Sequence, residues 1–407
     1  MFDLVIRNGR VVSPDAVIDA DVAVQGERIA GLLKTADPVP ARQVIDATGL
    51  YVVPGGIDSH VHFDMEFLGQ SKHTFESGTI AAAFGGTTTV IDFTLDLKTM
   101  GGPLLDTLER RREKAEGKAV VDFAFHSVIN NGSDRTLEDM EQVVAYGVPS
   151  FKLFTVYREA NLYVNDATLY NVMERLRDLG GIAAVHTENA DIIDYCTASL
   201  LAAGQRTPPH YLLLTEAMYT RPDGYNYVMS PPLRTEADNE ALWAGLAGGW
   251  LSTVSSDDNS VDVEDKRAGA ESFDRASPGC VDVETRIPLL FSEGVGKRHL
   301  PITRLVEVAS TNPARIFGLY PRKGILAAGS DADIVLIDPK ARLRASPQTL
   351  HMKVRYSPYD GWDLVGLPVT TISRGKVIVD KGVFLGTPGH GRFVKRAIDP
   401  GVLRAPF

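Results

Sequence analysis

Two histidines two residues apart are the feature of this sequence with the clearest chemical meaning. His60 and His62 end a short apolar run that follows a Pro-Gly-Gly turn at residues 54–56. In a β-strand, side chains at positions i and i+2 point to the same face, so both imidazoles can converge on one point. Converging neutral imidazoles suit a divalent metal ion such as zinc. Taken alone, the pair also fits two ordinary polar residues in a strand, so the interpretation depends on further ligands.

Three more side chains with ligand chemistry follow at the expected ends of later strands. Lys152 lies between bulky apolar residues, and a buried ammonium group tends to lose its proton. A neutral amine beside metal ions can take up carbon dioxide, which gives an anionic, two-oxygen ligand able to bridge two zinc ions. His186 and Asp257 each end another strand-like run. A snorkelling lysine, a core histidine and an aspartate N-cap are the ordinary alternatives at these positions.

The strands that must carry these residues alternate with helices after residue 54. The predicted strands are Ile57–His62, Thr87–Asp92, Val120–His126, Ser150–Thr155, Ile182–Thr187 and Leu251–Asp257. The predicted helices are Phe75–Phe84, Leu104–Glu116, Leu137–Ala145, Ala167–Asp178 and Asn189–Ala203. This alternation predicts an α/β fold with a parallel sheet, and a ring of βα units gathers functional residues at the carboxyl ends of its strands.

The two ends of the chain carry β signals of a different kind. Short apolar runs separated by turns fill residues 1–53, and the same texture returns from residue 323. We expect both ends to build one β-sandwich, from residues 1–53 and 323–385, with a barrel at 54–322 inserted between them. Residues 386–407 form a C-terminal tail.

The composition limits the partners and the compartment. A formal net charge of -10 argues against nucleic acid and acidic membranes as partners, because phosphate binding needs a basic face. The two cysteines are too few for a disulfide framework, and neither a signal peptide nor an apolar run of bilayer length is visible. We therefore expect a soluble, cytoplasmic protein.

Ordered motifs along nearly the whole chain resemble the amidohydrolase superfamily, specifically its dihydropyrimidinase/D-hydantoinase (cyclic amidohydrolase) branch. They are Pro54–His62, Gly85–Thr88, Phe151–Phe154 with Tyr157, His186–Asn189, Met229–Arg234, Thr311–Ala314, Gly329–Asp333 and Gly389–Phe393. The resemblance implies a TIM-type (β/α)8 barrel with a β-sandwich domain. It also implies zinc-dependent hydrolysis of the cyclic amide bond of hydantoins or dihydropyrimidines to N-carbamoyl amino acids.

The resemblance assigns roles to the metal ligands. His60, His62 and Asp257 would hold one zinc ion. His186 would hold the other, and carboxylated Lys152 would bridge the two. The zinc pair would lower the pKa of a shared water, which attacks the ring carbonyl. Asp257 would take the proton and pass it to the departing ring nitrogen.

The resemblance also implies how the substrate, a small cyclic ureide or imide, is bound. Tyr157 is similar to the family tyrosine that donates a hydrogen bond to the developing oxyanion. Ser230 resembles the position that binds the ring amide through its backbone, although locally it fits a turn residue equally well. A homotetramer or homodimer that uses the tail around Gly389–Phe393 is a further implication.

One stretch departs from the family pattern. The family carries another zinc histidine on the strand after His186, and no such motif occurs here. The segment between His186 and Asp257 is shorter than in the family by about two βα units of the barrel. Three explanations stay open: residues missing from the sequence, a true deletion with a weakened second metal site, or replacement of the histidine by His210. Asp258 is a second departure, since relatives often carry His or Asn there.

Two alternatives to hydantoin or dihydropyrimidine hydrolysis stay open. One is an allantoinase or another cyclic imide hydrolase, which uses the same chemistry. The other is a catalytically impaired scaffold that keeps the fold, favoured by the shortened segment and opposed by the retained ligands. Zinc content distinguishes enzyme from scaffold, because the enzyme needs about two ions per chain and the scaffold none.

Overall fold

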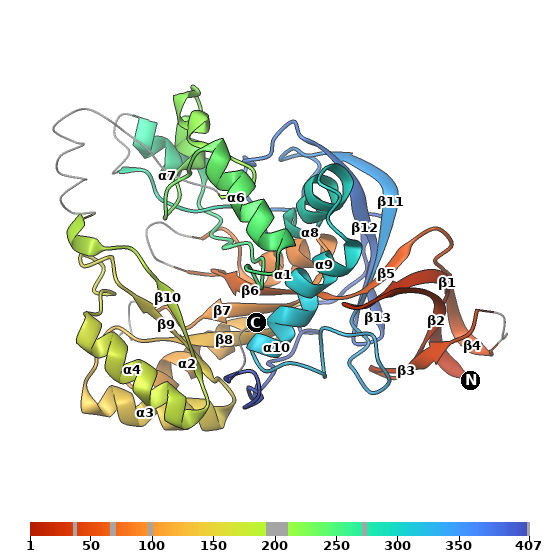
Figure 1. Cartoon of the computed structure of the whole chain (residues 1–407), viewed down its shortest axis with the longest axis horizontal. Helices are drawn as coiled ribbons and strands as arrows, with labels where there is room; N and C mark the ends of the chain where they lie inside the picture. The colour runs from red at the N-terminus through yellow and green to blue at the C-terminus, as the bar shows by residue number, and fades with distance from the viewer. Residues whose placement is uncertain (36–38, 66–70, 97–100, 193–210, 271–274, 405–407) are drawn as a thin grey trace.

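The structure is a computed structural model that describes the chain except for residues 36–38, 66–70, 97–100, 193–210, 271–274 and 405–407. Its described strands form two sheets, one of nine strands and one of five. Figure 1 shows the larger sheet towards one end of the molecule and the smaller sheet beside it, with helices above and below the smaller sheet in this view.

The nine-stranded sheet joins the two ends of the chain. Its order is β14-β13-β12-β11-β5-β1-β2-β3, with β4 paired to β1. Because β11 pairs with β5, the C-terminal strands extend the N-terminal sheet, as the sequence predicts. Buried aliphatic residues from both ends form its core, among them Ile6, Val22 and Ile334. The strands are β1 (Phe2–Val12), β2 (Val17–Gln25), β3 (Arg28–Leu33), β4 (Ala41–Asp46), β5 (Tyr51–Pro54), β11 (Ile334–Arg344), β12 (Asp363–Ser373), β13 (Lys376–Asp380) and β14 (Val383–Phe384).

The five-stranded sheet is parallel throughout and corresponds to half of a barrel. Its order is β10-β9-β8-β7-β6, and all neighbours pair in parallel. β7 and β8 are buried along their whole length, as parallel strands covered on both faces are. The strands are β6 (Gly56–Val61), β7 (Thr87–Phe93), β8 (Asp122–Val128), β9 (Ser150–Phe154) and β10 (Ile182–His186), and the helices between them are α1 (Phe75–Phe84), α2 (Leu104–Ala115), α3 (Asp134–Tyr146) and α4 (Asp166–Leu179).

Local sequence signals determine where these helices begin and end. The side chains of Thr74, Ser133 and Asn165 accept hydrogen bonds from the first turns of α1, α3 and α4, which satisfies backbone donors that a helix leaves unpaired. Gly147 and Gly180 end α3 and α4 at φ 107° and 70°, where a side chain would be strained. Both helices therefore close at a short turn that returns the chain to the next strand.

The remaining helices follow β10 in the chain. Among the described residues, no helix combines the length and the apolar character that a membrane crossing requires. The α-helices are α6 (Glu236–Ala247), α7 (Val263–Arg267), α8 (Arg286–Leu289), α9 (Ile302–Val306) and α10 (Asn312–Ile316), with 3-10 turns at Glu216–Thr220, Gly224–Tyr227 and Ala268–Ala270 and π-helical segments at Leu290–Lys297 and Glu307–Thr311.

The predicted strand Leu251–Asp257 is wrong. The segment is not part of a sheet, because its backbone groups bond to other partners. Ser256 N–H, for example, donates to the Asp58 carboxylate at 3.1 Å, and an isolated bridge links Asp258 to Val61 of β6. The segment therefore lies beside β6 through single contacts, and the described residues contain five parallel barrel strands instead of the predicted six.

Two further predictions concern the segment after β10 and the tail. The predicted helix Asn189–Ala203 falls largely outside the described residues, as does His210. The described part of the tail packs against the barrel of its own chain, where Val394 N–H donates to Phe123 O of β8 at 2.8 Å. The contribution of the tail to an oligomer stays a prediction.

Candidate metal centre

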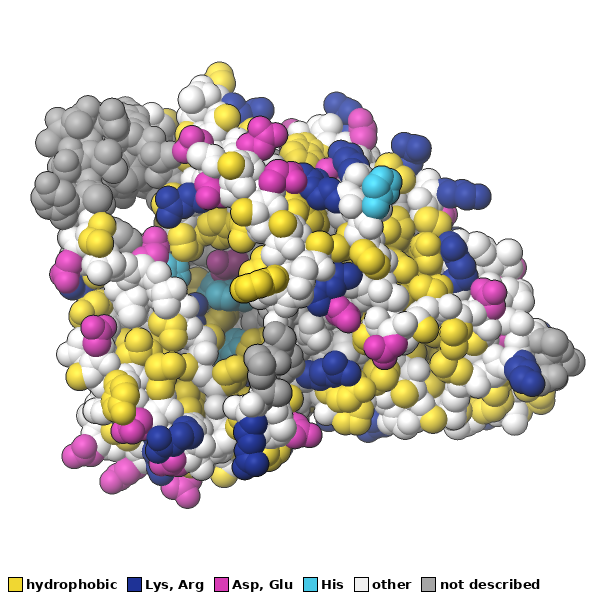
Figure 2. Space-filling model, viewed as in Figure 1, with side chains coloured by type: hydrophobic (Ala, Val, Ile, Leu, Met, Phe, Trp, Pro, Cys, Tyr) yellow, Lys and Arg dark blue, Asp and Glu magenta, His cyan; other side chains and the backbone are white. Residues whose placement is uncertain are grey.

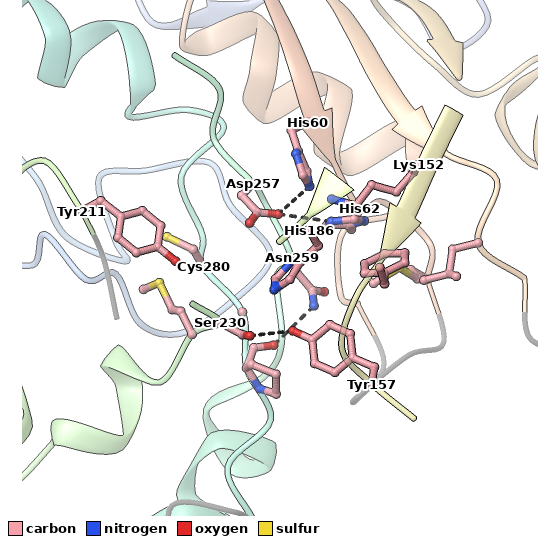
Figure 3. Close-up of a pocket in the computed structure, with 16 residues that line it drawn as sticks. His60, His62, Lys152, Tyr157, His186, Tyr211, Ser230, Asp257, Asn259 and Cys280 are labelled. Atoms are coloured by element: carbon pink, nitrogen blue, oxygen red, sulfur yellow. Dashed lines mark hydrogen bonds and ion pairs between the residues drawn. The ribbon is translucent and has the colours of Figure 1, made fainter. Parts of the chain in front are cut away.

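His60 and His62 lie where β6 ends, and both face the carboxylate of Asp257 (Figure 3). The Nε2 atoms of His60 and His62 each lie 3.1 Å from Asp257 Oδ1. One ligand atom from each of the three residues falls within 4.8 Å of the others. The i, i+2 spacing thus brings the imidazoles together as predicted, and the carboxylate reaches them from a segment far along the chain.

The backbone around Asp257 aims its side chain into the site. Asp257 has φ 53°, in the left-handed region that is uncommon for residues other than glycine. The neighbouring Asp258 is buried, and its carboxylate accepts a hydrogen bond from Asp282 N–H at 3.0 Å and lies 2.9 Å from His73 Nδ1. Asp258 is thereby engaged in holding the turn, and Asp257 is the carboxylate that faces the histidines.

Electrostatics favours the metal-binding protonation states of His60 and Asp257. Burial lowers the pKa of His60 to about 4, although Asp257 attracts the imidazolium form. Burial opposes ionisation of Asp257, but His60 and His62 outweigh it and hold the pKa of its carboxyl well below the usual range. Neutral imidazoles and an ionised carboxylate are the forms that coordinate divalent metals, so this donor set fits a metal ion.

Lys152 is the buried lysine that its apolar flanks predict. It lies in β9 and is 4% exposed, with Nζ 4.9 Å from the ring centre of Phe154 and 5.3 Å from that of Phe93. Burial lowers the pKa of Lys152 to about 8, against the attraction of Asp257. The side chain does not snorkel to solvent, and a large fraction of it is a neutral amine near pH 8, the form that reacts with carbon dioxide.

His186 ends β10 and belongs to a chain of hydrogen bonds along the pocket wall. His186 Nε2 lies 2.6 Å from Glu188 Oε2, and Ser230 Oγ donates to the same carboxylate oxygen at 3.0 Å. Tyr157 OH donates to Ser230 Oγ at 2.6 Å. Burial raises the pKa of Tyr157, so its hydroxyl keeps its proton at neutral pH. Glu188, to which the sequence analysis assigns no role, thus links the predicted substrate-binding residues to a predicted metal ligand.

All the predicted site residues line one open pocket. Figure 2 shows a hollow on this face of the molecule, with histidine and acidic side chains at depth. Residues without a role in the sequence analysis also line the cavity: Tyr211, Met229, Asn259, Pro278, Gly279 and Cys280. They lie outside strands and helices, where no periodicity marks which side chain faces inward.

A second buried lysine fastens two loops of the pocket wall. Lys266 of α7 is fully buried, and its Nζ donates to Val228 O at 2.8 Å and to Ser277 O at 3.4 Å. The first carbonyl belongs to the loop that carries Ser230, and the second to the loop that reaches Cys280. Lys266 therefore positions the side of the pocket opposite the barrel strands.

Known proteins are similar to this chain over almost its whole length. The model of the amidohydrolase family matches residues 51–378. D-hydantoinase of Geobacillus stearothermophilus is 38% identical over 456 aligned positions that cover 96% of each chain. D-hydantoinase of Rhizobium radiobacter is 34% identical, over 97% of this chain and 99% of its own. The crystal structure of dihydropyrimidinase from Brevibacillus agri has a TM-score of 0.93 and 36% identity, over 98% of this chain and 99% of that chain.

The alignments with the two D-hydantoinases have more positions than this chain has residues, although they cover nearly all of it. The alignment with the Geobacillus protein runs over 456 positions, whereas this chain has 407 residues. Several dozen positions of that relative therefore have no counterpart here, a difference in the direction that the shortened segment predicts. A family model that spans most of the chain, together with these full-length relatives, shows that the chain belongs to the amidohydrolase family.

Proposed function

We propose that the protein uses two zinc ions to hydrolyse the cyclic amide bond of hydantoins and dihydropyrimidines to N-carbamoyl amino acids. One observation carries the proposal: three imidazoles, an ionised carboxylate and a buried lysine of lowered pKa converge on one pocket. Relatives named D-hydantoinase and dihydropyrimidinase support the class of substrate.

The residues of the pocket suit a pair of metal ions. His60, His62 and Asp257 would hold one zinc ion, since their ligand atoms already lie within 4.8 Å of one another. His186 would hold the second ion, and Lys152, carboxylated on its neutral amine, would bridge the two. When bound, zinc supplies a Lewis acid and activates water at neutral pH.

The remaining steps depend on the protein's own side chains. Asp257 would take a proton from the attacking water and pass it to the ring nitrogen that leaves, because its carboxylate faces the centre of the site. Tyr157, which keeps its proton at neutral pH, would donate a hydrogen bond to the oxygen that becomes negative. Ser230 would bind the ring amide through its backbone, from the loop that Tyr157 OH already contacts.

Neither alternative function is favoured over this proposal. An allantoinase would need a different pocket wall but the same centre, and a catalytically impaired scaffold would need a lost centre. The names of the relatives favour hydantoins and dihydropyrimidines as substrates. The retained cluster of His60, His62 and Asp257 favours an enzyme over a scaffold.

The resemblance to hydantoinases also supports a homotetramer or homodimer in which the tail around Gly389–Phe393 takes part. Sedimentation at micromolar concentration measures the assembly directly. A monomer under these conditions would contradict this part of the proposal.

Ring opening by the zinc-loaded protein tests the proposed function. We expect the protein to hydrolyse a substituted hydantoin and dihydrouracil. Chromatography of the products measures this activity, and allantoin is assayed in parallel as the substrate of the alternative function. Asp257→Asn should abolish turnover but leave zinc bound, because the amide keeps one oxygen ligand and cannot accept the proton. Asp178→Asn, the same change on the surface of α4, should have no effect. Zinc-loaded protein that opens none of these rings would refute the proposal.

A further inference from the structure

The second metal position has fewer histidines than the first. The chain contains nine histidines, and among the described residues only His60, His62 and His186 line the pocket. The buried His73 is 2.9 Å from Asp258 and serves the turn there. If two metal ions bind, any further protein ligand that the described residues offer to the ion at His186 must therefore be of a different residue type.

Glu188 is the side chain that faces the Nε2 nitrogen of His186. Glu188 Oε2 lies 2.6 Å from His186 Nε2, and the two side chains are only 13% and 12% exposed. One position separates the two residues, which lie on either side of the end of β10, as His60 and His62 lie on either side of the end of β6. An imidazole and a carboxylate, both accepted ligands of zinc, thus lie side by side at this strand end.

The contact needs only a small adjustment to admit a metal ion. Zinc lies about 2.0–2.2 Å from nitrogen and carboxylate ligands, so two ligands of a tetrahedral site stand about 3.3 Å apart. The 2.6 Å separation of Glu188 and His186 must therefore lengthen by less than about 1 Å. Rotation of the Glu188 side chain, which lies beyond the end of β10, provides this change without moving the strand.

Ser230 holds the carboxylate in this orientation. Its Oγ donates to Glu188 Oε2 at 3.0 Å, and it also accepts a hydrogen bond from Tyr157 OH at 2.6 Å. Hydrogen bonds from outside a metal site orient its ligands and tune their basicity. The same bonds place the Tyr157 hydroxyl beside the second metal position.

We propose that the Glu188 carboxylate is a protein ligand of the second metal ion, at a position where the described residues offer no second histidine. This inference rests on the proposed two-zinc site, and it does not depend on which ring is opened. A carboxylate ligand at this position places a negative charge next to a divalent cation, and zinc accepts imidazole and carboxylate ligands alike.

The zinc content of matched variants tests this assignment. After dialysis of zinc-loaded protein, we expect two ions per wild-type chain and one per Glu188→Gln chain, because a neutral amide of the same size is a poor zinc ligand. Glu188→His should keep two ions, since it restores an imidazole. Glu174→Gln, the same change on the exposed face of α4, should also keep two. Circular dichroism establishes that each variant is folded.

The possible outcomes separate this inference from the proposed function. Two ions in folded Glu188→Gln would overturn it, and so would a single ion in the wild type. Loss of one ion in Glu188→Gln, with no ring opening by the wild type, would support Glu188 as a ligand and remove the proposed function. Cobalt-substituted protein adds a second readout, because the visible absorption of Co2+ reports its coordination: the spectrum should change in Glu188→Gln and not in Glu174→Gln.

Discussion

Lys152 at the metal centre and Lys323 at the junction of the two sheets are both buried, yet they have opposite electrostatic surroundings. Lys152 is 4% exposed and Lys323 is 1% exposed. Burial lowers the pKa of Lys152 to about 8. Burial also acts to lower the pKa of Lys323, but the neighbouring aspartates outweigh it and raise the pKa. Near pH 8 one lysine is therefore partly a neutral amine, whereas the other stays a cation.

Carboxylate groups make the difference between the two lysines. Lys323 Nζ lies 2.8 Å from Asp122, 3.2 Å from Asp331 and 2.5 Å from Asp333. Asp122 begins β8, and the other two aspartates precede β11, so the cluster connects the parallel sheet to the nine-stranded sheet. The three aspartates lie close enough together to hold a metal ion, but the ammonium group of Lys323 already binds them.

The comparison teaches that burial alone does not decide what a lysine does. Asp257 attracts Lys152, but its carboxylate is engaged with His60 and His62 at 3.1 Å. Among the described residues Lys152 has no ion-pair partner, which leaves its amine available as a reagent. Lys323 has three such partners and serves stability.

Lys152→Met should have the largest effect. We expect turnover to fall about a thousandfold or more, because the side chain proposed to join the metal ions is lost and with it several kcal/mol of transition-state stabilisation. The free energy of unfolding of the metal-free variant should stay the same or rise, since methionine fills an apolar site without a desolvated amine. Steady-state hydrolysis and urea denaturation measure the two effects. A variant with wild-type turnover would exclude Lys152 from the centre.

The same substitution at Lys323 should act on stability instead. Lys323→Met removes the cation that the three buried aspartates share. Asp122 keeps Arg374 and Asp331 keeps Arg322, but Asp333 loses its ion-pair partner, which should lower the free energy of unfolding by about 3–5 kcal/mol. Urea denaturation followed by circular dichroism measures this loss. Arg344→Met removes the exposed ion pair with Asp363 and should cost less than about 1 kcal/mol. Equal losses in the two variants would contradict the contrast between buried and exposed pairs.

Much of the fold can be predicted from the sequence because its signals are local. The predicted helix Phe75–Phe84 coincides with α1, where Thr74 forms a capping box and Gly85 follows the last turn. The predicted strand Leu251–Asp257 is the exception, because a strand forms only where a neighbouring strand pairs with its backbone. The segment has the β-branched residues of a strand, but the backbone beside it in the structure is not a partner strand.

A site residue can be predicted from the sequence where it is polar or charged and the residues beside it are apolar. Lys152 stands out because bulky apolar residues surround it. Lys266 is also buried, and burial lowers its pKa to about 7, but it lies in Val263–Arg267, whose charges are typical of an exposed helix. Glu188 lies in the motif His186–Asn189, but the sequence does not indicate its role, because its partner Ser230 is far along the chain and only folding brings their oxygens within 3.0 Å.

The pH dependence of the free energy of unfolding is the smallest expected effect and the sharpest test of the difference between Lys152 and Lys323. In metal-free protein the pKa of Lys152 falls from its ordinary 10.5 to about 8. Between these values the unfolded chain holds a proton on Lys152 that the folded chain has lost, so this residue makes the free energy of unfolding rise with pH, by at most about 1.4 kcal/mol per unit. Lys323 has a raised pKa in the folded state. Its contribution is therefore fully present below the unfolded pKa and is lost only at higher pH.

The stability differences between the wild type and the two lysine variants should therefore depend differently on pH across this range. Relative to Lys152→Met, the metal-free wild type should gain stability from about pH 8 to pH 10, whereas its advantage over Lys323→Met should stay constant. Urea denaturation of chelator-treated protein at several pH values measures both differences. Zinc with bicarbonate should abolish the Lys152 slope, because a carboxylated lysine no longer titrates as an amine. If the stability difference between metal-free wild type and Lys152→Met does not change with pH, the amine stays charged in the folded protein. A charged amine cannot take up carbon dioxide.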